Sequence, residues 1–162
     1  MSSTAAAPSE RILSKSFRDA GRPDIVKWDV FPVRDGERIV LTFEGAKAGD
    51  RHGVSLMTDI DLEVNGAHCR IASLWHDTSP AVVDMAVHTA DGRLHVYNIW
   101  DSGTGRNSQA WTSGMLVEEL PNGRRYRCND IGLAGAFDSV VFRLERVGNA
   151  AVVELHESPS QA

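Results

Sequence analysis

Dipeptides of Gly with Asp or Asn recur along the 162-residue chain, and they constrain its fold more than any other feature. They stand between stretches of alternating apolar and polar residues, at Asp35-Gly36, Asn65-Gly66, Asp91-Gly92, Asn122-Gly123 and Gly148-Asn149. Such pairs readily adopt the positive φ angles that tight hairpins need. They predict five hairpins, with arms at residues 25–33 and 37–44, 54–64 and 67–76, 81–89 and 93–101, 114–120 and 124–130, and 138–147 and 150–156.

The stretch 56–64 shows the clearest strand pattern. Leu, Thr, Ile, Leu and Val stand at every second position and alternate with Met, Asp, Asp and Glu, which gives one face to a core and one to water. Strands with one wet face indicate an antiparallel sheet. The same period predicts further inward sets, at Val26, Trp28 and Val30, at Ile39, Leu41 and Phe43, at Val83, Met85 and Val87, and at Val140, Phe142 and Leu144.

About ten strands of this kind predict an all-β fold, an antiparallel up-and-down meander. Closure into a barrel removes exposed strand edges, so a closed barrel is favoured, and a two-sheet β-sandwich is the alternative. A single β domain is expected over residues 9–156, between disordered tails at residues 1–8 and 157–162. Within it, residues 9–20 are expected to form a short helix or strap after a Ser9 cap.

The inferred meander is similar in architecture to the calycin-like barrels. This resemblance is one of shape, because no segment carries a family motif, and it implies a cavity for an apolar or amphipathic small molecule. Barrels of this shape serve as carriers, as haem pockets and as occasional isomerases, cyclases or decarboxylases, so the fold alone does not give the function. The identity of any cofactor is left open.

The charge balance and the spread of apolar residues exclude several classes of partner. With 17 basic and 22 acidic residues the net charge is −5, so the chain lacks the positive field that holds proteins on nucleic acid. No apolar run approaches the roughly 20 residues that cross a bilayer. The first ten residues lack the pattern of a secretory signal, so we expect a cytoplasmic protein that does not contact membranes. A homodimer is left open, because nothing specifies an interface.

Loop lengths predict where a ligand would bind. In a meander, odd and even connections lie at opposite ends; the odd ones here are tight turns, and the even ones are longer, at residues 45–53, 77–80, 102–113 and 131–137. One end should therefore be pinched and the other open. The predicted ligand site gathers inward polar and aromatic residues near the open end: Thr58, Ser73, Trp75, Asn98, Trp100, Trp111, Cys128 and Asp130. A one-residue slip in register would turn such groups to solvent instead.

Asn98 and Asp130 are the most informative residues of this set. A buried amide or carboxylate without a partner costs about 1–3 kcal/mol, so each is expected to contact the other, water or a ligand. Asp130 and His76 are the candidates for acid–base catalysis, because an imidazole beside a carboxylate can transfer protons near neutral pH. The six histidines lack metal-binding spacings such as HExxH, and no metal site is assigned.

Three hypotheses of function follow. The first is a small-molecule binding protein whose cavity, open at one barrel end, holds a partly apolar ligand. The second is a barrel enzyme of isomerase, cyclase or lyase type that uses Asp130 or His76 in the same cavity. The third is a β-sandwich module that binds carbohydrate or another protein through tryptophans on an outer face.

Overall fold

The computed structural model describes residues 7–147, which form eleven strands and one short helix. The elements are β1 (Ile12–Leu13), α1 (Lys15–Asp19), β2 (Val26–Pro32), β3 (Glu37–Ala46), β4 (Arg51–Val64), β5 (Ala67–Trp75), β6 (Val82–His88), β7 (Arg93–Asp101), β8 (Arg106–Ser108), β9 (Gly114–Leu120), β10 (Gly123–Asn129) and β11 (Val140–Arg146). Within this range no helix is long and apolar enough to traverse a bilayer.

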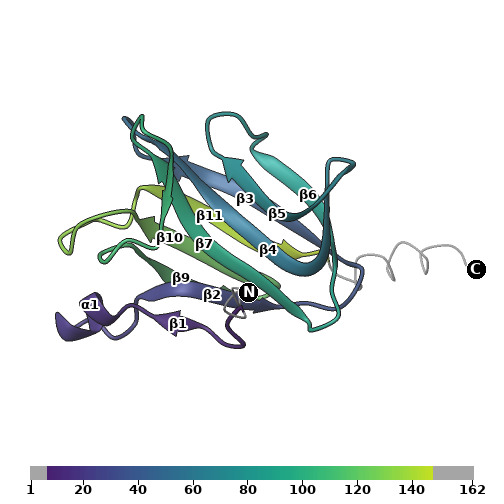
Figure 1. Cartoon of the computed structure of the whole chain (residues 1–162), viewed down its shortest axis with the longest axis horizontal. Helices are drawn as coiled ribbons and strands as arrows, with labels where there is room; N and C mark the ends of the chain where they lie inside the picture. Colours follow the sequence, from purple (N-terminus) through teal and green to yellow (C-terminus); the bar gives the residue numbers. More distant parts are fainter. Residues whose placement is uncertain (1–6, 148–162) are drawn as a thin grey trace, which may run out of the picture.

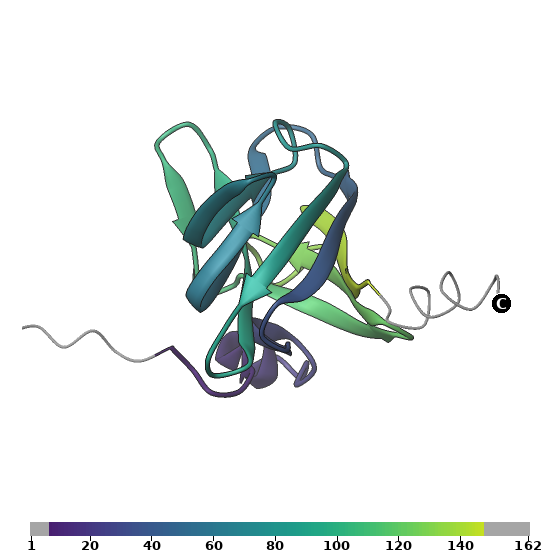
Figure 2. The ribbon, with the colours of Figure 1, turned by 90° about the vertical axis from the view of Figure 1, so that its right-hand side faces the viewer.

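Eight of the described strands close into an antiparallel barrel, in the order β2, β9, β10, β11, β3, β6, β4, β7 and back to β2. Figures 1 and 2 show the ribbon from two directions at right angles, with α1 and β1 (purple) beside the barrel. The short strands β1 and β8 pair at its margins, and β5 pairs with β4 outside the ring. The prediction of an all-β barrel is confirmed, and the alternative of a two-sheet sandwich is wrong.

The order of strands differs from the predicted meander. Two predicted hairpins form, β4 with β5 around Asn65-Gly66 and β9 with β10 around the turn at residues 121–122. At Asp35-Gly36 and Asp91-Gly92 the glycines do adopt positive φ angles, but the strands on either side pair with other neighbours. A turn dipeptide determines only the local backbone conformation and not which strands pair, which explains why the predicted order of strands is wrong. The arm at residues 150–156 lies outside the described part of the chain.

Successive strands nevertheless alternate in direction, so the expected difference between the two ends is present. Short connections of residues 33–36, 65–66, 89–92 and 121–122 meet at one end. The other four connections meet at the opposite end, which we call the open end: residues 47–50, 76–81, 102–113 and 130–139. The last three of these are longer than any connection at the first end. This holds because antiparallel order alone fixes the end at which each loop lies.

Side chains fill the middle of the barrel. Three of the predicted inward sets are buried, those on β3, β6 and β11, and stacked rings of Tyr126 and Phe142 lie among them with centroids 4.9 Å apart. On β2 the prediction is wrong for Trp28 and Val30, because Asp29 and Phe31 are buried instead. The strand changes partner there, from β9 at Val26 to β7 at residues 29–32, and the alternation shifts.

The N-terminal segment forms the predicted strap with a shorter helix than expected. The cap is Ser14, whose hydroxyl accepts from the amide of Phe17, and α1 spans Lys15–Asp19. Phe17 packs against Ile25 and Phe137 in a second small core. The strap thereby supports the loop of residues 130–139 at the open end.

A buried ionic cluster forms around Asp29, midway along β2. Its carboxylate accepts hydrogen bonds from Arg11 (2.8 Å), Arg124 (2.9 Å) and the hydroxyl of Tyr126 (2.6 Å). Burial pushes the pKa of Asp29 up, but the hydrogen bonds from Arg11 and Tyr126 and the charge of Arg124 outweigh it, and the pKa lies below its ordinary value. Asp29 therefore stabilises the fold in its ionised form.

Asp29→Asn is expected to lower the free energy of unfolding at neutral pH by on the order of 3 kcal/mol, since it leaves arginines around an uncharged group. The stabilisation is present above the unfolded-state pKa of about 3.9 and is lost as the pH falls through the lower folded-state pKa. The difference between wild type and variant in urea unfolding should therefore shrink below about pH 4. A constant difference down to pH 2 would contradict this account. Asp84→Asn, at an exposed pair with Arg38, is the control and should cost under about 1 kcal/mol.

Candidate functional site

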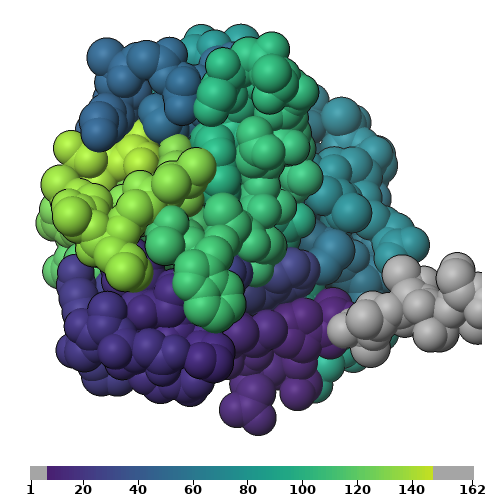
Figure 3. Space-filling view, turned by 60° about the vertical axis from the view of Figure 1, so that its left-hand side comes forward, coloured from purple at the N-terminus to yellow at the C-terminus, as the bar shows by residue number. Residues whose placement is uncertain are grey.

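Loops from four parts of the chain surround the open end. Figure 3 faces this side and shows the loop of residues 130–139 (yellow-green) between residues 47–50 (blue, above) and the N-terminal strap (purple, below). Main-chain bonds hold the loops together: the amide of Lys47 donates to the carbonyl of Ser139, and that of Ser139 to Cys128. The sequence folds in this way because β3 and β11 pair up to their open ends, at Ala46 and Val140.

A pocket of about 280 Å³ lies between these loops. The buried side chains of His52, Trp100 and Asp130 form part of its wall. The other lining residues come from the two loops and their margins: Lys47, Ala48, Gly49, Asp50, Asn129, Ile131, Gly135, Ala136, Asp138 and Ser139. The pocket is thus a small cavity at the mouth of the barrel, above a packed core, and it does not extend down the barrel axis.

Three buried polar side chains meet at this pocket and connect opposite walls of the barrel. Nδ1 of His52, on β4, lies 2.5 Å from Oδ2 of Asp130, which follows β10. The side-chain amide of Asn98, on β7, donates to Oδ1 of Asp130 over 2.9 Å. His52 is only 6% exposed, and Asn98 is 1% exposed. We call these three residues the His52–Asp130–Asn98 cluster.

The electrostatics of the cluster are set by burial. Burial raises the pKa of Asp130 above the ordinary carboxyl value, although the hydrogen bond from Asn98 and the neighbouring His52 pull it back. The nearby Asp50 carboxylate adds to the increase. Asp130 is therefore a carboxyl group whose ionised form is only partly compensated by its protein partners.

Among residues 7–147 the geometry leaves one nitrogen of His52 without a partner. An ionised carboxylate can only accept, so Nδ1 carries the proton in the contact with Asp130, and Nε2 of the neutral ring is an acceptor. Within residues 7–147 no group donates to Nε2, and the atom is buried. Buried polar atoms are normally satisfied, so an unsatisfied one in a pocket wall indicates a position for a ligand or water.

The loop that carries Asp130 is held by its neighbour Asn129. The Asn129 side-chain amide donates to the carbonyls of Thr112 and Gly132. On the other side of the loop, the hydroxyl of Ser139 accepts from the main-chain amide of Asp130. A Cβ at Gly135 would overlap the side chain of Asn129. The loop is therefore fixed on both flanks of the carboxylate, which keeps Asp130 in place for His52.

The structure brings four of the eight predicted ligand-site residues inside the barrel at its open half: Asn98, Trp100, Cys128 and Asp130. Trp100 and Asp130 line the pocket, and Asn98 binds Asp130 from behind. Cys128 is fully buried, and burial raises the pKa of its thiol. Their role in binding a ligand stays a prediction.

The other four lie elsewhere. Thr58 is buried but donates to the carbonyl of His88, toward the tight-turn end, because β4 begins at Arg51 and bulges between residues 57 and 62. Ser73 and Trp75 were expected inside the barrel, and this placement is wrong, because β5 pairs only with β4 outside the ring. Trp111 is 64% exposed.

The two acid–base candidates are not paired with each other. His76 packs edge-on against Phe43, and its main-chain amide donates to the carbonyl of His52. The neighbouring Asp77 is engaged by the guanidinium of Arg51. The partner of Asp130 is His52, which the sequence pattern places in the loop of residues 45–53. The sequence does contain a signal for an inward-facing His52, since this residue continues the period-two series of Val54 and Leu56.

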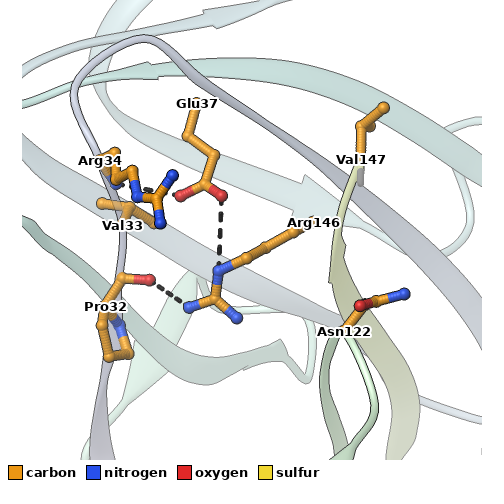
Figure 4. A pocket seen from close by; sticks show the side chains of 7 residues that line it. All are labelled: Pro32, Val33, Arg34, Glu37, Asn122, Arg146 and Val147. Atoms are coloured by element: carbon orange, nitrogen blue, oxygen red, sulfur yellow. Dashed lines mark hydrogen bonds and ion pairs between the residues drawn. The ribbon is translucent and has the colours of Figure 1, made fainter. Parts of the chain in front are cut away.

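A second pocket, of about 430 Å³, lies at the tight-turn end and is drawn in Figure 4. There Arg146 donates to the carbonyl of Pro32 and lies 3.5 Å from the carboxylate of Glu37. The same carboxylate accepts from the amide of Arg34. These contacts tie the turn at residues 33–36 to the end of β11, which is a structural role.

Among the described residues, no group of three or more His, Cys, Asp or Glu side chains is placed to hold a metal ion. No family model, no curated protein and no solved structure matches the chain. The assignment of the site therefore depends on its geometry alone.

Asn98→Leu is expected to raise the pKa of Asp130 further, because it removes the hydrogen bond that favours the ionised carboxylate. It should also lower the free energy of unfolding at neutral pH by about 1–3 kcal/mol, the cost of leaving a buried acceptor without its donor. Carboxyl-carbon NMR of Asp130 during a pH titration checks the first effect. An unchanged titration midpoint would show that Asn98 does not bind Asp130; Asn107→Leu, at an exposed site on β8, is the control.

Proposed function

We propose that the protein binds a small molecule in the open-end pocket, with His52 and Asp130 as polar anchors and Trp100 as an aromatic wall. The single observation that carries this proposal is the buried Nε2 of His52, which has no donor among residues 7–147. A ligand that reached this atom would satisfy it. Ligand sites commonly combine an apolar wall with a few placed polar groups of this kind.

The energetic cost of the cluster supports the same conclusion. An unsatisfied buried nitrogen and a partly compensated buried carboxylate each cost about 1–3 kcal/mol, so the cluster destabilises the empty protein. Apolar side chains in place of these polar ones would remove that cost. A ligand that hydrogen-bonds to the same polar atoms would remove it as well, and the gain would contribute to the free energy of binding. Polar groups that weaken the fold and belong to residues lining one small pocket are typical of a binding site.

The closed barrel is compatible with the predicted carrier of a partly apolar ligand. The pocket lies at the open end, where the sequence predicts the ligand cavity, and the likeness to calycin-like barrels remains a proposal about architecture. The cytoplasmic location also stays a prediction. The sandwich on which the carbohydrate-binding hypothesis depended is not formed.

A barrel enzyme is the second candidate, and the contact between His52 and Asp130 favours it. A carboxylate that orients an imidazole through Nδ1 leaves Nε2 free to take a proton from a bound molecule. In this version His52 replaces His76 as the base, and Asp130 holds it. Chemical conversion of the bound molecule by wild type, lost in Asp130→Asn even at ligand concentrations that saturate the variant, would distinguish the enzyme from a carrier.

Protein purified from its own host is expected to carry a bound small molecule that native mass spectrometry detects. Its removal should shift the fluorescence emission of wild type, because Trp100 lies in the pocket wall, and the shift should disappear in Trp100→Phe. His52→Phe should reduce the bound fraction at least tenfold, because it removes the polar anchor.

The matched control is Trp75→Phe, because Trp75 lies outside the barrel beneath the guanidinium of Arg51. It should retain both the bound species and the emission shift. A ligand-free wild type that binds no member of a broad metabolite mixture would refute the proposed function.

A further inference from the structure

We propose that the open-end pocket takes a small organic cation, an amine in its ammonium form. This inference rests on the proposed function, since it names the class of ligand for the same pocket. It depends on two independent observations, both made over residues 7–147: an excess of carboxylates that form no ion pair with a lysine or arginine, and a buried acceptor of His52 that has no donor.

The first observation is the charge of the pocket wall. Three of its lining residues are acidic, Asp50, Asp130 and Asp138, and one is basic, Lys47. The wall therefore carries a net negative charge when the carboxylates are ionised and His52 is neutral. Such a surface attracts cations and repels anions.

The partners of these carboxylates distinguish them from other acidic groups in the protein. Asp29 is paired with Arg11 and Arg124, and Asp77 with Arg51. In the part of the chain that the structure describes, the carboxylate of Asp130 has only His52 and Asn98 as side-chain partners. No arginine or lysine in this range forms an ion pair with any of the three pocket carboxylates, so their charge is available to a ligand.

The second observation is the hydrogen-bonding character of His52. With Nδ1 donated to Asp130 and the ring neutral, the buried Nε2 can only accept. An ammonium group has three donors and no acceptor, so it complements this nitrogen and the nearby carboxylates together. A carboxylate ligand would bring acceptors and negative charge to a wall that already has both.

Trp100 also favours a cationic ligand. Its side chain is almost fully buried and forms part of the pocket wall. Indole rings attract cations as well as apolar groups, so an amine with a short apolar or aromatic portion would use the whole pocket. This agrees with the partly apolar ligand expected from the sequence.

Benzylamine, benzyl alcohol and benzoate test the proposal, because they share a ring and differ in charge. Isothermal titration calorimetry at pH 7 should show the tightest binding for benzylamine, weaker binding for benzyl alcohol and none for benzoate. The ring resonances of His52 should shift on addition of benzylamine. Asp130→Asn should weaken benzylamine binding at least tenfold and change benzyl alcohol binding little.

Two further variants distinguish an effect of pocket charge on binding from an effect on folding. Asp138→Asn alters an exposed rim carboxylate and should weaken benzylamine binding about threefold with no effect on folding. Asp61→Asn is the matched control, because Asp61 contacts Nδ1 of His68 over 2.7 Å at an exposed site away from the pocket. It should leave benzylamine binding unchanged.

The outcomes distinguish this inference from the proposed function. If benzoate or benzyl alcohol binds most tightly and shifts the resonances of His52, the assignment of a cationic ligand is overturned, and the site remains one for a small molecule. Absence of benzylamine binding, or benzylamine binding that Asp130→Asn and Asp138→Asn leave intact, would also overturn it. The proposed function fails separately, if the protein carries and binds no small molecule.

Discussion

Pairing of β7 with both β4 and β2 closes the barrel, and the arrangement of the open end depends on that closure. Residues Asp29–Pro32 of β2 pair with Arg93–Val96, while the other edge of β7 pairs with β4. A strand held on both edges cannot rotate, so Asn98 faces the interior and reaches Asp130 on the far wall. An open sheet would separate these residues and would expose the carboxylate to water.

Two buried aspartates show how differently one fold can treat the same side chain. At Asp29 the protein supplies two arginines and a tyrosine hydroxyl, and the pKa of the carboxyl lies below its ordinary value. At Asp130 it supplies an amide and an imidazole, and burial keeps the pKa above that value. The first cluster is complete within the protein and stabilises it. The second is incomplete, and its position in a pocket wall connects that deficit with ligand binding.

The sequence predicted the barrel, the two unlike ends and the inward positions of Asn98 and Asp130, because period-two alternation and loop length survive any change in strand order. It did not predict which strands pair, since turn dipeptides such as Asp35-Gly36 act over a few residues and pairing is decided by the whole core. The prediction that Ser73 lies inside the barrel is wrong for this reason, because it assumed that β5 is a strand of the ring. His52 was missed because β4 begins three residues before the predicted arm at residue 54, inside what reads as a glycine-rich loop.

The protonation of the two ring nitrogens of His52 tests the central claim most directly. Nitrogen-15 NMR of the ligand-free protein at neutral pH should show a proton on Nδ1, shared with Asp130, and an unprotonated Nε2 whose resonance changes when benzylamine is added. A proton on Nε2 in the free protein would contradict the account, because the pocket would then present a donor to its ligand and would favour an anion.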